Sequence, residues 1–122
     1  MERGPVKDLT KFGNRKTVVD GATFDSRKEA RRFAELKLLE RAGEVRNIQR
    51  QVPFVLIPAQ LDERGKVIEN PARYIADFVY NDRAGRLIVE DVKGYKQGTA
   101  YAVFVLKRKL MLKVHGIRVT EV

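Results

Sequence analysis

The chain has 122 residues, with 25 lysines and arginines against 16 aspartates and glutamates, so its formal net charge is +9. This length predicts one domain with a single core. Cysteine is absent and His115 is the only histidine, which excludes disulfides, a thiolate nucleophile and a cysteine-rich zinc site, and leaves only His115 to support a histidine-bound zinc or a Ser-His-Asp triad.

The positive charge favours a polyanionic partner, and nucleic acid is the commonest one. A cationic membrane-surface protein or a merely solvated basic surface is the alternative. Apolar runs such as residues 100–106 are too short to cross a bilayer, and the first residues lack the apolar centre of a signal peptide. We therefore expect a cytoplasmic protein without a membrane partner.

Residues 1–16 contain glycine, proline and five basic residues without an apolar period, which predicts a flexible basic arm before a folded domain over residues 17–122. Lys16, at the end of this arm, is a candidate DNA contact; a poorly ordered terminus is the alternative. Two short apolar stretches, residues 17–19 and 22–24, flank Asp20-Gly21, which is typical of a two-residue β-hairpin turn.

A helix is expected from about residue 27 to Ala42. Ser26 is a good N-cap, and Glu29 three residues later completes a capping box. Glu29 also lies one turn before Phe33, at the margin of the apolar stripe, where its carboxylate could reach inward over a sheet. The residue pattern alone favours the capping role.

Residues 45–58 read as a strand in which Pro53 indicates a bulge or an edge. Gln51 within it is a candidate to hydrogen-bond a phosphate or a metal-bound water, although a solvated strand position explains it equally well. Residues 61–72 are rich in turn residues and predict a second short hairpin.

Residues 73–80 and 87–93 predict an antiparallel pair of central strands around a turn at 81–86. If Asn81 opposes Leu87, then Asp77 opposes Asp91, with their β-carbons about 5 Å apart and Lys93 projecting beside them. A slip of one residue would instead put Asp77 opposite Glu90, which stays the fallback ligand.

Two carboxylates and a lysine inside apolar strands are costly unless they are paired or hold a cation. Oxygen ligands on adjacent strands suit Mg²⁺ or Mn²⁺, and a lysine beside them can orient a water and stabilise developing charge on a phosphodiester. A structural salt bridge among Asp77, Asp91 and Lys93 is the alternative interpretation.

After a loop that holds Lys96, residues 100–115 predict a helix that ends at Gly116, and residues 117–122 predict a last strand. Lys107 and Lys109 belong to a basic ridge on this helix. The ridge and Lys96 are candidate DNA contacts, and a solvated helix face is the alternative.

Four ordered segments resemble a known family. Residues 24–30, Gln51-Val52-Pro53-Phe54, residues 74–78 and residues 89–94, with Asp77 followed by Asp91-Val92-Lys93, are similar to small phage and prophage proteins of the PD-(D/E)XK nuclease superfamily. The similarity covers most of residues 12–122. Ala76 stands where the superfamily's name has proline.

This resemblance implies an α/β fold with a restriction-endonuclease-like core, a central mixed β-sheet flanked by helices. It also implies Asp77, Asp91 and Glu29 as metal ligands, Lys93 as the catalytic lysine and Mg²⁺ or Mn²⁺ as the cofactor. The expected function is metal-dependent endonucleolytic cleavage of phage or branched DNA, in the cytoplasm of a bacterial host if the protein is phage-encoded. Symmetric cutting of two strands makes a homodimer an expectation as well.

Two other function classes stay open. A catalytically silent DNA-binding module of a phage recombination or packaging complex predicts salt-sensitive DNA binding without metal-dependent turnover. A structural or interaction protein with an ion-pair network predicts neither metal binding nor appreciable DNA affinity.

Overall fold

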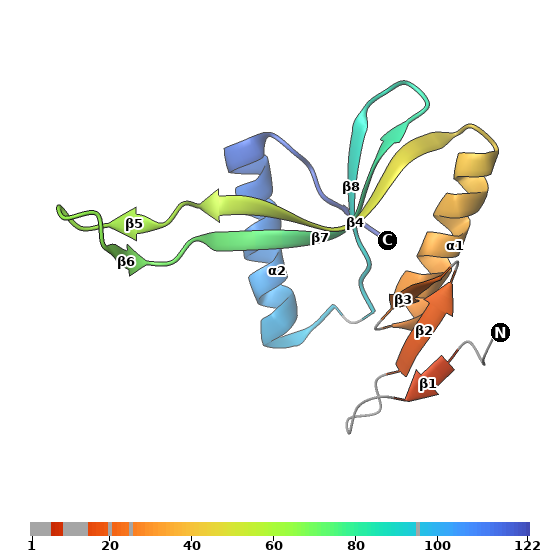
Figure 1. Ribbon diagram of the computed structural model, residues 1–122, viewed down its shortest axis with the longest axis horizontal. Coiled ribbons are helices and arrows are strands. Elements are labelled where there is room, and N and C mark those ends of the chain that lie inside the picture. Colours follow the sequence, from red (N-terminus) through yellow and green to blue (C-terminus); the bar gives the residue numbers. More distant parts are fainter. Residues whose placement is uncertain (1–5, 9–14, 20, 25, 95) are drawn as a thin grey trace. The chain divides into compact units, whose positions relative to one another are not determined.

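The computed structural model describes residues 6–8, 15–19, 21–24, 26–94 and 96–122 (Figure 1). The chain divides into two compact units, Met1–Ile48 with Asn81–Arg86, and Gln49–Tyr80 with Leu87–Val122. The sequence predicted a single core over 17–122. The boundary between the units falls inside two long strands, β4 (Val45–Ile57) and β7 (Ala72–Asp82), whose continuous β-pattern offers no composition change that would mark it.

The first unit holds a small antiparallel sheet in the order β1 (Val6–Asp8), β2 (Arg15–Val19), β3 (Ala22–Phe24). Val19 pairs with Ala22, which confirms the predicted hairpin. Part of the segment predicted to be a flexible arm is thus paired, because β1 and the start of β2 lie within residues 1–16. The rest of that arm lies outside the described residues.

Helix α1 (Arg27–Arg41) also belongs to the first unit. Its start is confirmed, since the Ser26 side chain accepts a hydrogen bond of 3.0 Å from the backbone nitrogen of Glu29. Gly43, with φ of 79°, follows the last turn and supplies the left-handed conformation that ends many helices. Phe33 packs on Phe24 with ring centroids 5.0 Å apart, joining the helix to β3.

A four-stranded sheet is ordered β4 (Val45–Ile57), β7 (Ala72–Asp82), β8 (Leu87–Asp91), β9 (Thr120–Glu121). Strands β8 and β9 are parallel, whereas a tight turn joins β7 to β8, so the sheet is mixed as predicted. Strands β5 (Gln60–Leu61) and β6 (Val67–Glu69) form the second predicted hairpin at the far end of β4 and β7 (Figure 1).

The two hairpin turns, β7 to β8 and β5 to β6, have the same hydrogen-bond pattern. In the turn between β7 and β8, the Asp82 carboxylate accepts bonds from the backbone nitrogens of Ala84 and Arg86, and Gly85 has φ of 85°. In the turn between β5 and β6, Asp62 and Gly65 repeat the arrangement. The backbone bond of 2.9 Å from Asp82 to Arg86 sets the register in which Asn81 faces Leu87, as predicted.

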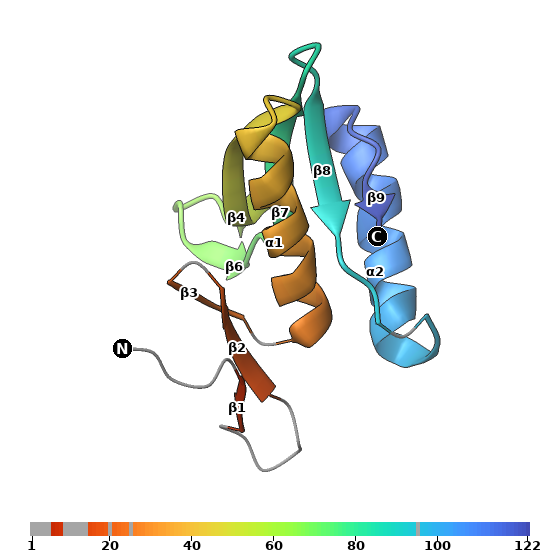
Figure 2. The ribbon, with the colours of Figure 1, turned by 90° about the vertical axis from the view of Figure 1, so that its right-hand side faces the viewer.

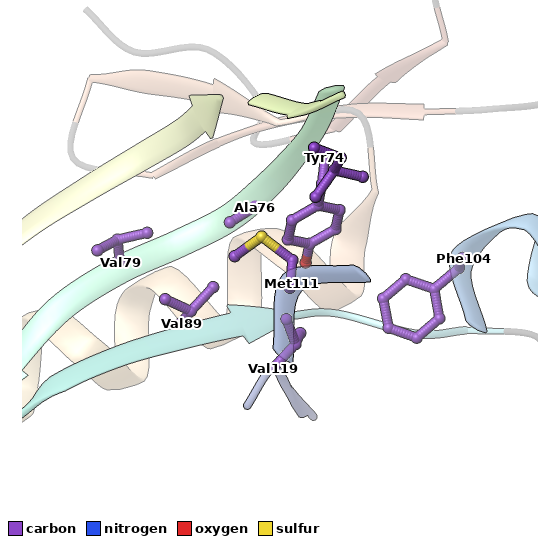
Figure 3. Packing of buried hydrophobic residues seen from close by; sticks show 8 residues of the cluster. Tyr74, Ala76, Val79, Val89, Phe104, Met111 and Val119 are labelled. Atoms are coloured by element: carbon purple, nitrogen blue, oxygen red, sulfur yellow. The ribbon is translucent and has the colours of Figure 1, made fainter. Parts of the chain in front are cut away.

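Helix α2 (Gly98–Leu110) continues as a π-helical turn, Met111–His115, and ends at Gly116. Figure 2 shows it beside β8 and β9. Its Phe104 and Met111 pack with Tyr74, Ala76 and Val79 of β7 and Val89 of β8 in the core of the second unit (Figure 3); Leu56 and Val119 complete that cluster. Among the described residues, no helix is long and apolar enough to cross a membrane.

Candidate active site

Asp77 lies where the alternation of β7 changes phase. Tyr74 and Ala76 belong to the core cluster against α2, and regular alternation would next put Phe78 there. The next residue of β7 in the cluster is Val79 instead. Phe78 is fully buried but is not a member of the cluster. The alternation of β7 therefore changes phase between Ala76 and Val79, the segment that contains Asp77.

The Asp77 carboxylate connects β7 to both neighbouring strands. One oxygen accepts a 2.8 Å bond from the backbone nitrogen of Val92, just after the end of β8, and the other accepts a 3.2 Å bond from the Gln51 amide of β4. Burial raises the pKa of Asp77; the Val92 bond opposes the rise and the nearby Asp91 charge adds to it. The Asp77 carboxylate thus lies beside the backbone of Val92, the residue that follows Asp91.

Gln51 adopts a backbone conformation that glutamine rarely takes. Its φ is 52°, in the left-handed region, which costs a residue with a β-carbon about 1–2 kcal/mol. Such strain persists where surrounding contacts require it and is frequent at functional sites. Here the strained residue is the one whose amide holds the Asp77 carboxylate.

Asp91, the last residue of β8, is 5% exposed and has a partner on each oxygen. The Tyr74 hydroxyl donates to one oxygen at 2.8 Å, and the Lys93 ammonium lies 2.6 Å from the other. Burial raises the pKa of Tyr74 far above its ordinary value and Asp91 adds to this, so the phenol stays a donor. These two contacts offset the desolvation of a buried charge.

Lys93 is held on a second side by an aromatic ring. Its nitrogen lies 3.8 Å from the centroid of the Phe104 ring, a close cation–π contact. The side chain keeps 20% of its surface exposed. The ammonium is thus fixed beside Asp91 with access to solvent.

Glu121 of β9 is an acidic residue that the sequence reasoning missed. It pairs with Asp91 in the parallel register, accepts bonds from Tyr101 at 3.1 Å and Arg108 at 2.7 Å, and lies 3.6 Å from Lys96. Burial raises the pKa of Glu121, but the hydrogen bonds from Arg108 and Tyr101 and the nearby Lys96 charge outweigh it, so the pKa lies below its ordinary value. The sequence predicted a last strand at residues 117–122, but its parallel pairing with β8, which puts Glu121 next to Asp91, is a tertiary contact without a local signal.

Glu90 is buried beside Tyr80. Its side chain is 1% exposed and accepts a 2.5 Å hydrogen bond from the Tyr80 hydroxyl. Tyr80 does not belong to the hydrophobic core cluster that contains Val89 and Tyr74, the partner of Asp91. This agrees with the register in which Glu90 points to the opposite face from Asp91. Its role as a fallback ligand has no support in these contacts.

The predicted third ligand, Glu29, belongs to α1 in the first unit, and the cluster described above consists of second-unit residues alone. Within the described ranges, no three acidic, histidine or cysteine side chains are grouped to hold a metal. The pair Asp77 and Asp91 nevertheless fits a hard cation, because Mg²⁺ is usually held by one or two carboxylates together with waters and substrate phosphates.

The predicted DNA contacts have separate places in the structure. Gln51 holds Asp77, Lys96 is near Glu121, Lys107 lines a cavity beside α2, and Lys109 is exposed on that helix. Lys16 is in β2, and its side chain lies outside the part that the structure describes. Arg108, which lies between Lys107 and Lys109 in the sequence, pairs with Glu121 at 2.7 Å.

Residues 9–121 match the model of a protein family described as "Protein of unknown function (DUF1064)". Neither a curated protein nor a solved structure shows a significant match to the chain. The match includes all the residues of the cluster on β7, β8 and β9.

Proposed function

The chain therefore belongs to the DUF1064 family, and because that description assigns no activity, we propose from the chemistry of the site that the protein is a metal-dependent DNA endonuclease. The observation that carries this proposal is the convergence of Asp77, Asp91 and Lys93 at the end of β8. The proposal includes a PD-(D/E)XK assignment for the sheet and α2, and a homodimer as the form that cuts two strands.

In this proposal, Asp77 and Asp91 hold a Mg²⁺ or Mn²⁺ ion, which would neutralise charge on the phosphate. Lys93 orients the attacking water and stabilises the charge that develops on the phosphate oxygens. Phe104 and Asp91 hold the ammonium in place for that role. The excess of basic residues attracts the DNA backbone.

The test is an assay of labelled duplex, flap, bulge and junction DNA with Mg²⁺, with Mn²⁺ and with EDTA. We expect cleavage with either cation and none with EDTA, and restored cleavage when Mg²⁺ is added in excess. Cleavage that persists in EDTA, or absence of cleavage on every substrate with both cations, would contradict the proposal.

A catalytically silent DNA-binding module is the second candidate. The observation that favours it is that both Asp91 oxygens already have partners, Tyr74 and Lys93. It predicts DNA binding that weakens steeply with salt and is unchanged by divalent cations.

Gln51→Gly is expected to separate stability from cleavage. Glycine adopts positive φ without strain, so the free energy of unfolding should stay equal or rise by up to about 1 kcal/mol despite the lost amide bond. Cleavage should fall about 10- to 100-fold, as for loss of a group that orients a ligand. Urea unfolding and initial cleavage rates measure the two effects.

Asn47→Gly is the matched control, because Asn47 has φ of 60° and its amide bonds to Asn81 rather than to Asp77. It should relieve similar strain without slowing cleavage. Equal loss of cleavage in both glycine variants would show that backbone flexibility, and not the hold on Asp77, is responsible.

A further inference from the structure

A cavity of about 290 Å³ opens beside Asp91 and Lys93, between β7 and α2. Its other lining residues are of two kinds, basic (Arg73, Lys107) and mostly apolar (Tyr74, Ile75, Ala100, Val103, Phe104). All of them belong to the second unit. The active-site pair thus forms one part of the wall of a larger concave surface.

The apolar part of this wall is unusually open to solvent. Ile75 of β7 is 53% exposed and Val103 of α2 is 47% exposed, and both line the cavity. Exposed apolar side chains at a concave site typically mark a surface that a ligand covers. The flat face of a nucleobase is a ligand of this kind, because bases removed from a stack are bound between apolar or aromatic side chains.

The charged part of the wall suits a phosphate. Arg73, Lys93 and Lys107 contribute three basic groups, against the single acid Asp91, which Lys93 already neutralises in part. Basic groups next to apolar side chains are the combination that binds single-stranded nucleic acid. The volume is at the lower end of ligand sites, roughly 300 Å³, and thus suits one nucleotide rather than a duplex.

We propose that this cavity binds one unpaired nucleotide of the DNA strand next to the cleaved phosphate. In a continuous duplex each base is stacked and paired, so its face is not available to Ile75 and Val103. The preferred substrates are therefore DNAs with an unpaired nucleotide, such as a flap, a bulge or a branch. This inference rests on the proposed nuclease function for its position relative to the cleavage site.

The test uses Val103→Trp, which fills the cavity from an exposed helix position, and Leu106→Trp as the matched control. Leu106 is on the same helix, 59% exposed, and does not line the cavity. Cleavage is measured with Mg²⁺ on a duplex and on the same duplex with one unpaired nucleotide. Wild type and Leu106→Trp should prefer the unpaired substrate by roughly tenfold or more, the expected value of one base contact. Val103→Trp should lose that preference, because the tryptophan occupies the place of the base, so its rate on the substrate with the unpaired nucleotide should exceed its rate on the duplex by less than about twofold.

A binding measurement in EDTA is independent of catalysis. A 2-aminopurine placed as the unpaired nucleotide should change its fluorescence with wild type and Leu106→Trp but not with Val103→Trp. If duplex is cut but neither readout distinguishes the variants, the cavity assignment is overturned while the nuclease function stands. If nothing is cut, the fluorescence result alone decides the cavity assignment. Tighter binding of the corresponding oligoribonucleotide would overturn the assignment to DNA.

Discussion

Asp91→Asn is expected to abolish metal-dependent DNA cleavage. Loss of groups that only orient a metal ligand costs about 10- to 100-fold, so loss of a direct ligand should exceed about 100-fold. Asparagine keeps the shape of the side chain and an oxygen that accepts from the Tyr74 hydroxyl. The measurements are the initial cleavage rate with Mg²⁺ and the binding of Mn²⁺ to the free protein, and both should be lost.

The same substitution has a predictable cost in stability. The new amide group faces the Lys93 ammonium at the position of the former 2.6 Å ion pair, so two donors meet. We expect a loss of about 1–3 kcal/mol in the free energy of unfolding. Circular dichroism and urea unfolding establish that the variant is folded in the assay.

Glu69→Gln is the control for Asp91→Asn, because it removes one negative charge from an exposed position on β6. It should leave cleavage and Mn²⁺ binding unchanged. Wild-type cleavage by a folded Asp91→Asn variant would contradict the assignment of Asp91 as a ligand.

Local chemistry made both hairpin turns predictable. Asp62 with Gly65, and Asp82 with Gly85, specify their turns within five residues, and the second turn sets the register in which Asn81 faces Leu87. In the first unit, the Ser26 cap is likewise a contact between residues three apart. These features need no knowledge of the tertiary fold.

The details of the site depend on contacts between distant segments and so escaped prediction. Strict alternation puts Asp77 on a regular strand face, whereas the phase change gives its carboxylate a bond to the Val92 backbone. The partner of Asp91, Tyr74, looked like an ordinary core residue because its hydroxyl has no sequence signature. Gln51 was noticed as polar, but its positive φ depends on a three-dimensional irregularity in β4.

Lys93→Met is expected to abolish turnover while leaving cation binding intact or tighter. Methionine fills a similar volume and keeps a favourable contact with the Phe104 ring. The Lys93 ammonium lies 2.6 Å from one Asp91 oxygen. Without it, a divalent cation no longer competes with the ammonium for that oxygen. Cleavage should fall by about 10²- to 10³-fold, the usual loss for a group that stabilises transition-state charge.

The control is Lys109→Met, which removes a lysine from the exposed side of α2 without touching Asp91. Both lysine variants weaken general attraction to DNA equally, so a difference between them reports on the site and not on net charge. Calorimetric titration of Mn²⁺ and single-turnover cleavage rates provide the two measurements.

Asp91→Asn and Lys93→Met together distinguish a metal site from a structural ion pair. If Asp91 and Lys93 form only a structural pair, either substitution should lower stability, and neither should affect cation binding or DNA cleavage. If Asp91 is a ligand and Lys93 the catalytic cation, the first variant loses Mn²⁺ binding and the second retains it, although cleavage is lost in both. The interpretation as a nuclease site requires this divergence, because the two residues are partners in the structure and have different roles in the proposed reaction.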